Sequence, residues 1–472
     1  MKVKHFKDKI SKGLGSAILF LKDNPGEAHR YDNTILWACC HNTKYDSQCE
    51  TDRGQYLYEA ICLSSSKDKL EDILLEKLLQ NKKYWDVDQL FDIAVIMYEN
   101  GNTKAKETMY SKFRSYLDEV LRIKVYNRYR LEAATAGAVA IIDMDGFDGL
   151  EFVADIMGRI MISTGREEIF DTDWIISHAE NELGEVEVKN FFGNKSLANE
   201  NIKTFIDEYN SHIVSRHEYQ QNRKKELPDY ETIISIVDEY CSEEKMRLGR
   251  RNILRRLGKK ANKKELIKVA NELENTTDEI KQIALLHVFI NAVYPLRIDF
   301  LLNLSYSNNK ELAGAAATAL ENIKDNRIHD LALDLIKDKE LSVYALGLLK
   351  LNFENDFDIV LDLLKSEYER LKIEESEFDF HSLTMGVREI FEYNKSIDSI
   401  DILLFLYHNT TCSYCRTIIV EIMCNTGVLP DNIAEECQYD CVLEIREMAT
   451  KHLKMKKYDC LKTCRTQIVN PL

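Results

Sequence analysis

Asp143 and Asp145 are the residues of this sequence whose surroundings most resemble a catalytic motif. They lie in the stretch GAVAIIDMDGFDGLE (137–151), where apolar residues run directly into the first aspartate. An aspartate at the end of a β-strand can act as a nucleophile toward a phosphoryl group. If the two aspartates are catalytic, the pattern indicates phosphoryl transfer.

The sequence offers no room for the sheet that such chemistry needs. A phosphatase of the haloacid dehalogenase type carries its next motif, a serine or threonine, at the end of a second parallel strand. The counterparts here are Ser163 and Thr164, and only seventeen residues separate Asp145 from Ser163. A strand–helix–strand unit occupies about 30 residues or more. We therefore predict no catalytic residues in this stretch.

Helical periodicity explains the same residues better. Apolar side chains recur at spacings of three and four on both sides of the aspartates, which is typical of helices with one buried face. Between the two apolar stripes, the sequence MDGFDG contains two glycines and predicts a turn. The apolar stripes are Leu131, Ala134, Ala138 and Ile142 before the turn, and Leu150, Val153, Ala154, Met157 and Met161 after it.

Cys412 and Cys415 form a CxxC pair, and His408 lies four residues before the first thiol. Thiolates and imidazoles at short spacing can bind zinc, and a CxxC pair can also be redox-active. No second CxxC and no paired histidine completes four ligands at the spacing of a zinc finger. Free cysteine also packs as a small apolar residue. We predict structural thiols, no metal and no cofactor, with zinc and redox chemistry as alternatives.

A polar run before residue 54 is a candidate loop for contacting a ligand. Its candidate contact residues are Tyr45, Asp46, Arg53 and Tyr56. The alternative, which we favour, is that Asp46 and Arg53 form a buried ion pair that holds neighbouring helices in register.

The strongest local anomaly is the segment KMRLGRRNILRRLGKKANKK (245–264), which contains ten basic residues and no acid in a chain of formal net charge −16. On a helix Arg247, Arg251 and Arg255 share one side. The apolar residues predicted to face the core are Met246, Ile253, Leu254 and Leu257. The predicted partner- or phosphate-binding residues are Arg247, Arg250, Arg251, Arg255, Arg256, Lys259 and Lys260.

Something should compensate these like charges, because basic residues four positions apart on a helix repel one another. Guanidinium groups suit phosphate, so nucleic acid or another phosphate-rich partner is one hypothesis. An acidic protein partner is the second hypothesis. The third is that the basic face pairs with the chain's own acidic surface or is simply solvated. No aromatic residue alternates with the basic ones, which argues against stacking on a single strand.

Length and composition describe a folded, soluble protein with several domains or a repeat array. Only five of the 472 residues are proline, which favours helices. The negative net charge argues against nucleic-acid binding over the whole surface. No apolar run approaches the roughly 18 residues that span a bilayer. Twelve cysteines without an export signal favour a reducing compartment, so we expect a cytoplasmic protein that does not bind membranes.

Helix pairs repeat about every 30 residues in the second half of the chain. KELAGAAATALENI begins at residue 310 and KELSVYALGLLKLN begins at 339, with DNRIHDLALDLI between them. The pattern predicts an all-α fold, specifically an α-solenoid of stacked antiparallel helix pairs. We expect irregular helical hairpins over residues 1–225, HEAT-like repeats over 226–454 and a C-terminal tail over 455–472. The best candidate joint is SRHEYQQNRKKELPD (215–229).

The segment from about 230 to 454 resembles HEAT repeats, with a second-helix pattern in CQYDCVLEIREMATKHL. Stretches near both ends, LWACCHNTKYDSQCETDRGQYLYEAI and CSYCRTIIVEIM among them, resemble a group of uncharacterised bacterial HEAT-repeat proteins. The resemblance implies a superhelical architecture and carries no agreed activity.

We therefore expect a non-catalytic interaction scaffold that binds a macromolecular partner, in first place a protein, on its solenoid surface. The alternative is a nucleic-acid-associated protein that uses the basic helix 245–264. A third hypothesis, which rests on fold analogy alone, is a HEAT-repeat enzyme such as a lyase that handles a prosthetic group.

Overall fold

The protein is all-helical. The computed structural model describes residues 1–122, 128–165, 170–222, 227–374 and 376–468, and these ranges hold 25 α-helices and no β-strand. The predicted all-α fold class is confirmed. None of the helices in these ranges combines the length and the apolar composition that a membrane-spanning segment needs.

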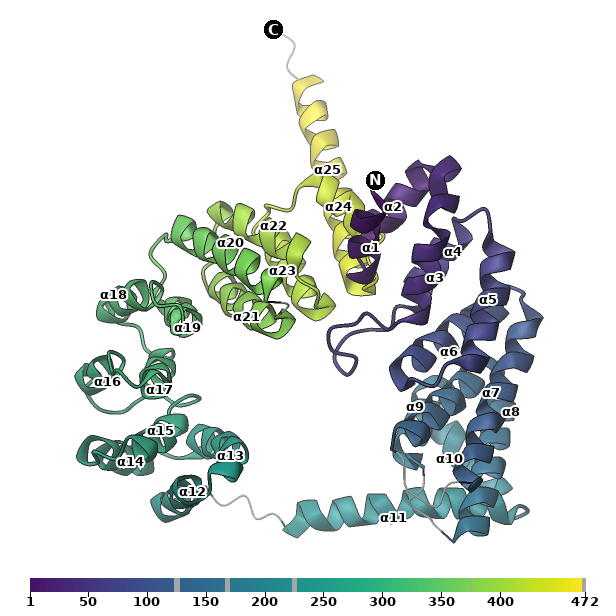
Figure 1. Ribbon diagram of the computed structural model, residues 1–472, viewed down its shortest axis with the longest axis horizontal. Helices are drawn as coiled ribbons and strands as arrows, with labels where there is room; N and C mark the ends of the chain where they lie inside the picture. Colours follow the sequence, from purple (N-terminus) through teal and green to yellow (C-terminus); the bar gives the residue numbers. More distant parts are fainter. Residues whose placement is uncertain (123–127, 166–169, 223–226, 375, 469–472) are drawn as a thin grey trace. The chain divides into compact units, whose positions relative to one another are not determined.

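The chain folds into two compact units (Figure 1). Unit 1 comprises Met1–Arg223, Thr411–Tyr414 and Pro430–Leu472, and unit 2 comprises Lys224–Thr410 and Cys415–Leu429. The division falls inside the predicted joint, 215–229, of which residues 223–226 lie outside the described ranges. The segment 430–454 groups with unit 1, whereas the sequence suggested that it continues the repeats of the second half.

Unit 1 contains the helices predicted from the apolar periodicity of the first half of the chain. Along the chain, α3 packs on α4, α5 and α6, while α8 packs on α6, α7, α9 and α11. The bounds are α1 (Val3–Ser11), α2 (Gly15–Asp23), α3 (Asp32–Cys40), α4 (Gly54–Cys62), α5 (Lys67–Gln80), α6 (Tyr84–Glu99), α7 (Thr103–Arg122), α8 (Arg128–Thr164), α9 (Thr172–Leu183), α10 (Glu185–Lys195), α11 (Glu200–Asn222), α24 (Asp431–Cys437) and α25 (Leu443–Ile468).

Helix α8 contains the stretch that resembled a phosphatase motif. It consists of two helical segments joined at Gly146, whose φ of +58° lies in the left-handed region that glycine adopts readily. The predicted turn is therefore a kink at this one residue. Both predicted apolar stripes are buried: the first from Ala134 to Ile142 and the second from Leu150 to Met161. The side chain of Leu131, also predicted for the first stripe, is not among those that the structure describes.

The two aspartates of α8 bind side chains of the neighbouring helices. The carboxylate of Asp145 accepts hydrogen bonds from Lys106 Nζ and Tyr110 Oη of α7, both at 2.6 Å. Asp143 Oδ1 lies 2.5 Å from His178 Nε2 of α9. Both acids thus hold helices together at the kink.

The pair of His178 and Asp143 predicts a pH-dependent stability. The hydrogen bond and the charge of Asp143 raise the pKa of His178 above its ordinary value of about 6.5. The stabilisation is therefore fully present below pH 6.5 and is lost as the pH rises through the raised pKa. Thermal unfolding from pH 5.5 to 8.5 should show His178→Gln less stable than wild type at the acid end, with the difference shrinking toward pH 8.5. His5→Gln, at an exposed histidine of α1, is the control; a gap that is the same at every pH would contradict the prediction.

Helices from the two ends of unit 1 pack against each other. The amide of Cys441, which follows α24, donates to the carbonyl of Gly13 at 3.0 Å. A side-chain carbon at Gly15 would lie 1.8 Å from the carbonyl oxygen of Glu436, so the backbones of α2 and α24 are in direct contact. Segments more than 400 residues apart in sequence therefore share one core.

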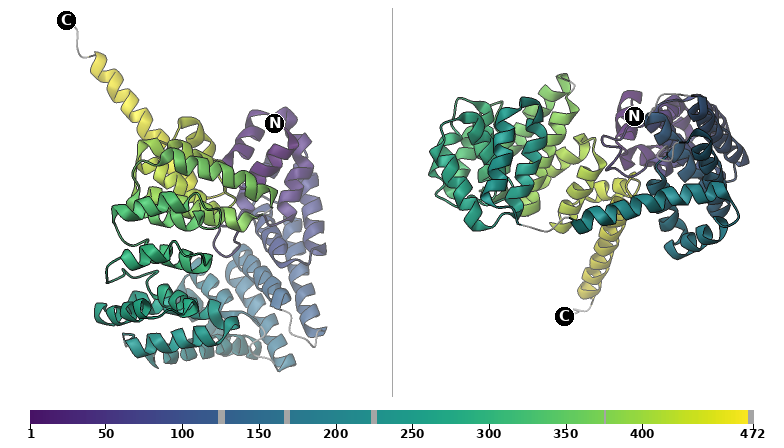
Figure 2. Two further views of the ribbon diagram at one scale, coloured as in Figure 1. Left: turned by 60° about the vertical axis from the view of Figure 1, so that its left-hand side comes forward. Right: turned by 90° about the horizontal axis from the view of Figure 1, so that it is seen from below.

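Unit 2 is a succession of short helices. In the left view of Figure 2 they follow one another from bottom (teal) to top (green). The row α13, α15, α17, α19 and α21 is in contact in that order, and α12, α14, α16, α18 and α20 each pack on a member of it. The bounds are α12 (Tyr230–Ser242), α13 (Arg247–Lys260), α14 (Lys263–Asn275), α15 (Glu279–Val288), α16 (Asp299–Leu304), α17 (Lys310–Leu320), α18 (Asn326–Leu335), α19 (Ser342–Asn352), α20 (Phe357–Ile373), α21 (Glu377–Tyr393) and α22 (Ile400–Asn409), and α23 (Ser413–Asn425) begins in unit 1 and continues into unit 2.

Helix α17 shows why these helices pack closely. The side chain of Asn309 caps it by accepting hydrogen bonds from the amides of Glu311 and Leu312. Its predicted apolar stripe is buried, and α17 packs on both α15 and α19. The basic helix α13 packs in the same row, against α15.

Candidate functional site

The basic helix α13 is anchored to unit 2 by a close backbone contact. A side-chain carbon at Gly258 would lie 1.8 Å from the carbonyl oxygen of Val288, at the end of α15. Leu254, one turn earlier, is fully buried. The prediction that Met246 also faces the core is wrong, because this residue precedes α13 and its side chain is 42% exposed. Leu254 and Gly258 therefore fix which side of α13 faces outward.

Three arginines one turn apart form what we call the arginine stripe: Arg247, Arg251 and Arg255. All three are half-buried, on the same side of α13 as predicted. Their Nε atoms are buried, and none of these atoms has a hydrogen-bond partner among the residues that the structure describes. The stripe is about 12 Å long, because an α-helix rises about 1.5 Å per residue. Buried donors without partners are costly, so this surface is suited to an anionic ligand.

The other basic residues of α13 differ from the stripe. Arg250 Nε lies 2.6 Å from Glu239 Oε2 of α12, which neutralises this guanidinium within the unit. Arg256 is exposed and donates to the carbonyl of Asn252 in its own helix. The remaining two predicted residues, Lys259 and Lys260, are exposed in the last turn of α13, where cations favour the helix dipole.

Aromatic side chains from other helices lie beside the stripe. The guanidinium of Arg247 lies 5.7 Å from the ring centroid of Tyr240 in α12. That ring meets the ring of His287 in α15 edge-on at 5.8 Å. The pKa of His287 is lowered to about 3, mainly by burial and further by the charges of Arg255 and Arg251. This imidazole is therefore neutral at physiological pH. The absence of aromatic residues between the arginines in sequence was therefore a poor guide to the surface.

Glu321, just after α17, is the acid that interacts with Arg255 across the unit. Burial and the nearby Glu389 raise its pKa to about 7, against the opposing effect of Lys350 and Arg255. A carboxyl group that is partly protonated near neutral pH is a weak counter-charge. Glu321 therefore neutralises the charge of Arg255 only in part.

The loop before α4 is held together by a buried ion pair. Arg53 Nη2 lies 3.0 Å from Glu50 Oε2, and both side chains are inaccessible to solvent. The sequence suggested Asp46 as the partner of Arg53; instead the amide of Asp46 donates to Glu50 Oε1 at 2.8 Å. Tyr56 is buried and donates to the carbonyl of Leu14, while Tyr45 and Asp46 are half-buried. The predicted Asp46–Arg53 pair is therefore wrong in its acid: Arg53 forms the buried ion pair with Glu50, and Tyr56 is buried beside this loop.

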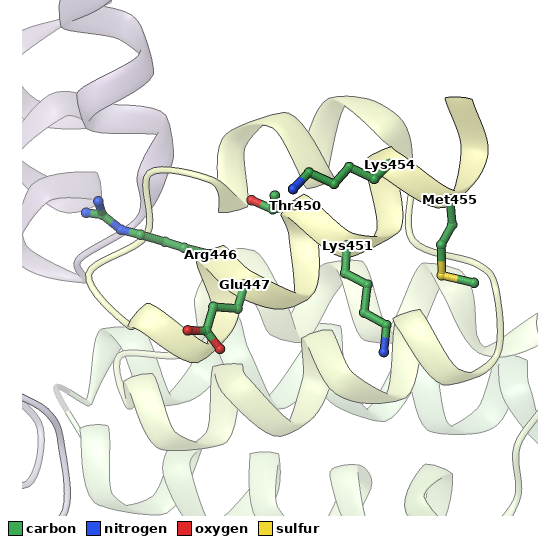
Figure 3. Close-up of a pocket in the computed structure, with 6 residues that line it drawn as sticks. All are labelled: Arg446, Glu447, Thr450, Lys451, Lys454 and Met455. Atoms are coloured by element: carbon green, nitrogen blue, oxygen red, sulfur yellow. The ribbon is translucent and has the colours of Figure 1, made fainter. Parts of the chain in front are cut away.

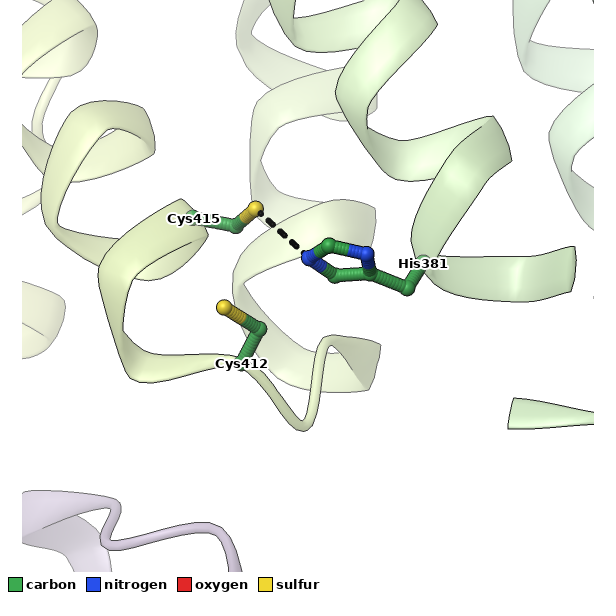
Figure 4. A group of neighbouring side chains, drawn as sticks. All are labelled: His381, Cys412 and Cys415. Atoms are coloured by element: carbon green, nitrogen blue, oxygen red, sulfur yellow. Dashed lines mark hydrogen bonds between the residues drawn. The ribbon is translucent and has the colours of Figure 1, made fainter. Parts of the chain in front are cut away.

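Cys415 lies near the imidazole of His381 (Figure 4) and near the guanidinium of Arg388, both in α21. Its Sγ is 3.4 Å from His381 Nε2 and 3.8 Å from Arg388 Nη1. The sequence suggested His408 as the imidazole of this cluster, but the ring of His408 packs against Tyr407. The guanidinium of Arg388 beside this thiol disfavours a bound cation. Both Cys412 and Cys415 are buried.

A shallow groove of about 440 Å³ runs along α25 in unit 1 (Figure 3). Half of its lining residues are basic, but Lys451 and Lys454 are exposed and Arg446 pairs with Glu59 of α4 at 3.3 Å. Exposed lysines bind anions weakly because solvent screens them. The groove is a weaker candidate than the arginine stripe. Its lining residues are Arg446, Glu447, Thr450, Lys451, Lys454 and Met455.

Comparison with known proteins adds little to this geometry. No protein-family model matches the sequence, and no curated protein matches it. Among solved structures, an engineered protein from the Northeast Structural Genomics Consortium is similar at 13% identity, with a TM-score of 0.30 over 81% of this chain and 98% of that one. So loose a similarity carries no argument about fold family or function. The resemblance to HEAT repeats rests on the sequence patterns alone.

Proposed function

We propose that this protein is a non-catalytic scaffold, built as a HEAT-like α-solenoid, which binds an acidic segment of a partner protein on the arginine stripe. The observation that carries the proposal is the set of three buried Nε atoms on successive turns of α13, which have no hydrogen-bond partner within the described ranges and, unlike Arg250 Nε, no ion-pair partner there either. The ordered contacts along α13, α15, α17, α19 and α21 support the solenoid, because stacked repeats contact their sequence neighbours.

The dimensions of the stripe favour a protein segment over nucleic acid. A stripe about 12 Å long with half-buried guanidiniums matches a few side-chain carboxylates, which accept paired hydrogen bonds from arginine. Nucleic-acid binding draws its affinity from neutralising many phosphates across a broad basic surface.

Fluorescence anisotropy with the full-length protein tests this function. The probe is a fluorescein-labelled twelve-residue peptide of alternating glutamate and serine. The wild type should bind it in a salt-sensitive manner, and Arg247→Gln/Arg251→Gln/Arg255→Gln should weaken binding by at least tenfold. Each hydrogen bond to a charged group is worth about 1.5–3 kcal/mol, and tenfold corresponds to only about 1.4 kcal/mol.

A charge-matched variant separates the stripe from net charge. Lys324→Gln/Lys339→Gln/Lys372→Gln removes the same three charges from exposed positions of unit 2 and should bind within about threefold of wild type. Equal losses in both triple variants, or no binding by the wild type, would refute the proposal. A twelve-nucleotide single strand, measured in parallel, tests the alternative: tighter binding of it through the stripe would favour a nucleic-acid-associated protein.

A further inference from the structure

One polar group beside the arginine stripe is not accounted for by a carboxylate ligand. His287 is only 7% exposed, and its Nδ1 is buried with no hydrogen-bond partner in the described part of the chain. Its ring packs on Tyr240, and its helix α15 ends where Gly258 of α13 makes backbone contact. Tyr240 contacts both His287 and Arg247, and the charges of Arg255 and Arg251 act on the imidazole, so the unpartnered nitrogen lies beside the arginine stripe.

The donors gathered here exceed what one carboxylate can satisfy. Arg251 and Arg255 are one turn apart, so their charges repel and a ligand between them must carry close to two negative charges. A carboxylate carries one charge and two oxygens. A phosphate monoester carries about 1.5–2 negative charges at neutral pH and three acceptor oxygens. Two guanidiniums and one neutral imidazole N–H match those three oxygens.

We propose that the partner's anchoring group is a phosphorylated serine or threonine, whose phosphate binds between Arg251 and Arg255 with a hydrogen bond from His287 Nδ1. This inference rests on the proposed function, because it names the chemical group by which the acidic segment is recognised. Arg247, one turn away and beside Tyr240, then binds a flanking acidic residue. Regulation follows: a kinase acting on the partner would switch binding on.

The number of charges on each phosphate favours a phosphorylated protein over nucleic acid. A phosphodiester in a nucleic-acid backbone carries one negative charge, as a carboxylate does, and so leaves the Arg251–Arg255 repulsion half compensated. A monoester placed once in a protein segment supplies the second charge at a single point, which is what this short stripe requires.

Three degenerate peptide pools of eleven residues, fixed at the centre as phosphoserine, glutamate or serine, provide the test. Each is labelled with fluorescein and titrated with the full-length protein. We expect the phosphoserine pool to bind at least tenfold more tightly than the glutamate pool, and the serine pool to bind weakest. Inorganic phosphate should compete with the phosphoserine pool at lower concentration than acetate does.

Substitutions that keep the charge test the geometry. Arg251→Lys/Arg255→Lys preserves both charges but removes the paired donors of guanidinium, so the phosphoserine preference should fall to threefold or less. His287→Phe keeps the ring and removes the N–H, and should reduce the preference by a smaller factor. Arg250 pairs with Glu239, so Arg250→Lys should leave the preference for phosphoserine unchanged. Thermal unfolding of each variant confirms that it is folded.

The outcomes separate the two proposals. Equal binding of the phosphoserine and glutamate pools, with both lost in the stripe triple variant, would overturn the phosphate inference and leave the scaffold function standing. Binding of none of the pools would overturn both. Tighter binding of a single-stranded oligonucleotide than of the phosphoserine pool, through the same residues, would overturn the phosphoprotein assignment.

Discussion

Replacing Arg53 with methionine is expected to lower the free energy of unfolding by about 3–5 kcal/mol, because it leaves the Glu50 carboxylate buried without its counter-ion. Arg53 also donates to Thr43 Oγ1 at 2.9 Å and to the carbonyl of Ser11. Burial alone would raise the pKa of Glu50; Arg53 and the amides of Asp46 and Ser413 outweigh it and hold that pKa below its ordinary value. Removing the guanidinium therefore disrupts several contacts of unit 1 at once.

Tryptophan fluorescence during urea unfolding measures this effect, since the three tryptophans, at positions 37, 85 and 174, all lie in unit 1. The double variant Glu50→Gln/Arg53→Met should recover part of the loss, because it no longer buries an unpaired charge. Arg30→Met, which removes an exposed arginine paired with Glu27 at 3.0 Å, is the control and should change little. An Arg53→Met transition that coincides with wild type would contradict the structure of this loop.

The second large effect is expected from Gly258→Ala. The added methyl group would meet the carbonyl oxygen of Val288 at 1.8 Å, which forces α13 away from α15. Such overpacking costs about 1–3 kcal/mol even though alanine favours a helix more than glycine does. The shift also moves the arginine stripe relative to His287, so binding of the acidic peptide should weaken together with stability.

A matched glycine on the same helix makes this test specific. A side-chain carbon added at Gly249 would have no described atom of another element within 4 Å, so Gly249→Ala should stabilise α13 by about 0.5–1 kcal/mol. Circular dichroism follows the unfolding of both variants, while tryptophan fluorescence reports unit 1 separately. If Gly258→Ala and Gly249→Ala have the same stability, the close contact between α13 and α15 does not exist in solution.

Periodicity predicted the helices well because each helix buries a regular face. The stripe from Leu312 to Leu320 in α17 and both stripes of α8 have the burial expected from spacings of three and four. The sequence predicted a turn of several residues around Gly146, whereas the structure has a kink at this single residue. A segment with two glycines does not show whether the helix continues directly after the kink. The shared side of Arg247, Arg251 and Arg255 also followed from helical spacing.

The sequence did not predict side-chain partners that come from distant helices. Nothing in the letters around Arg251 indicates His287, more than 30 residues later, because that contact depends on how α15 packs on α13. Likewise Arg53 selected Glu50 over Asp46, and Cys415 lies near His381 instead of the sequence neighbour His408. Short spacings suggest candidate pairs, but the packing of helices chooses between them.

The contact between Gly13 and Cys441 has a consequence for biosynthesis. At about 5–20 residues per second, a ribosome needs about 20–90 s to add the 428 residues between these two positions (441 − 13). Throughout that time the apolar side of α2 that later receives α24 lacks its partner and is available to chaperones or to premature self-association. Unit 1 is therefore completed late in synthesis, and nascent chains halted before residue 430 should be more prone to aggregation than chains that contain α24.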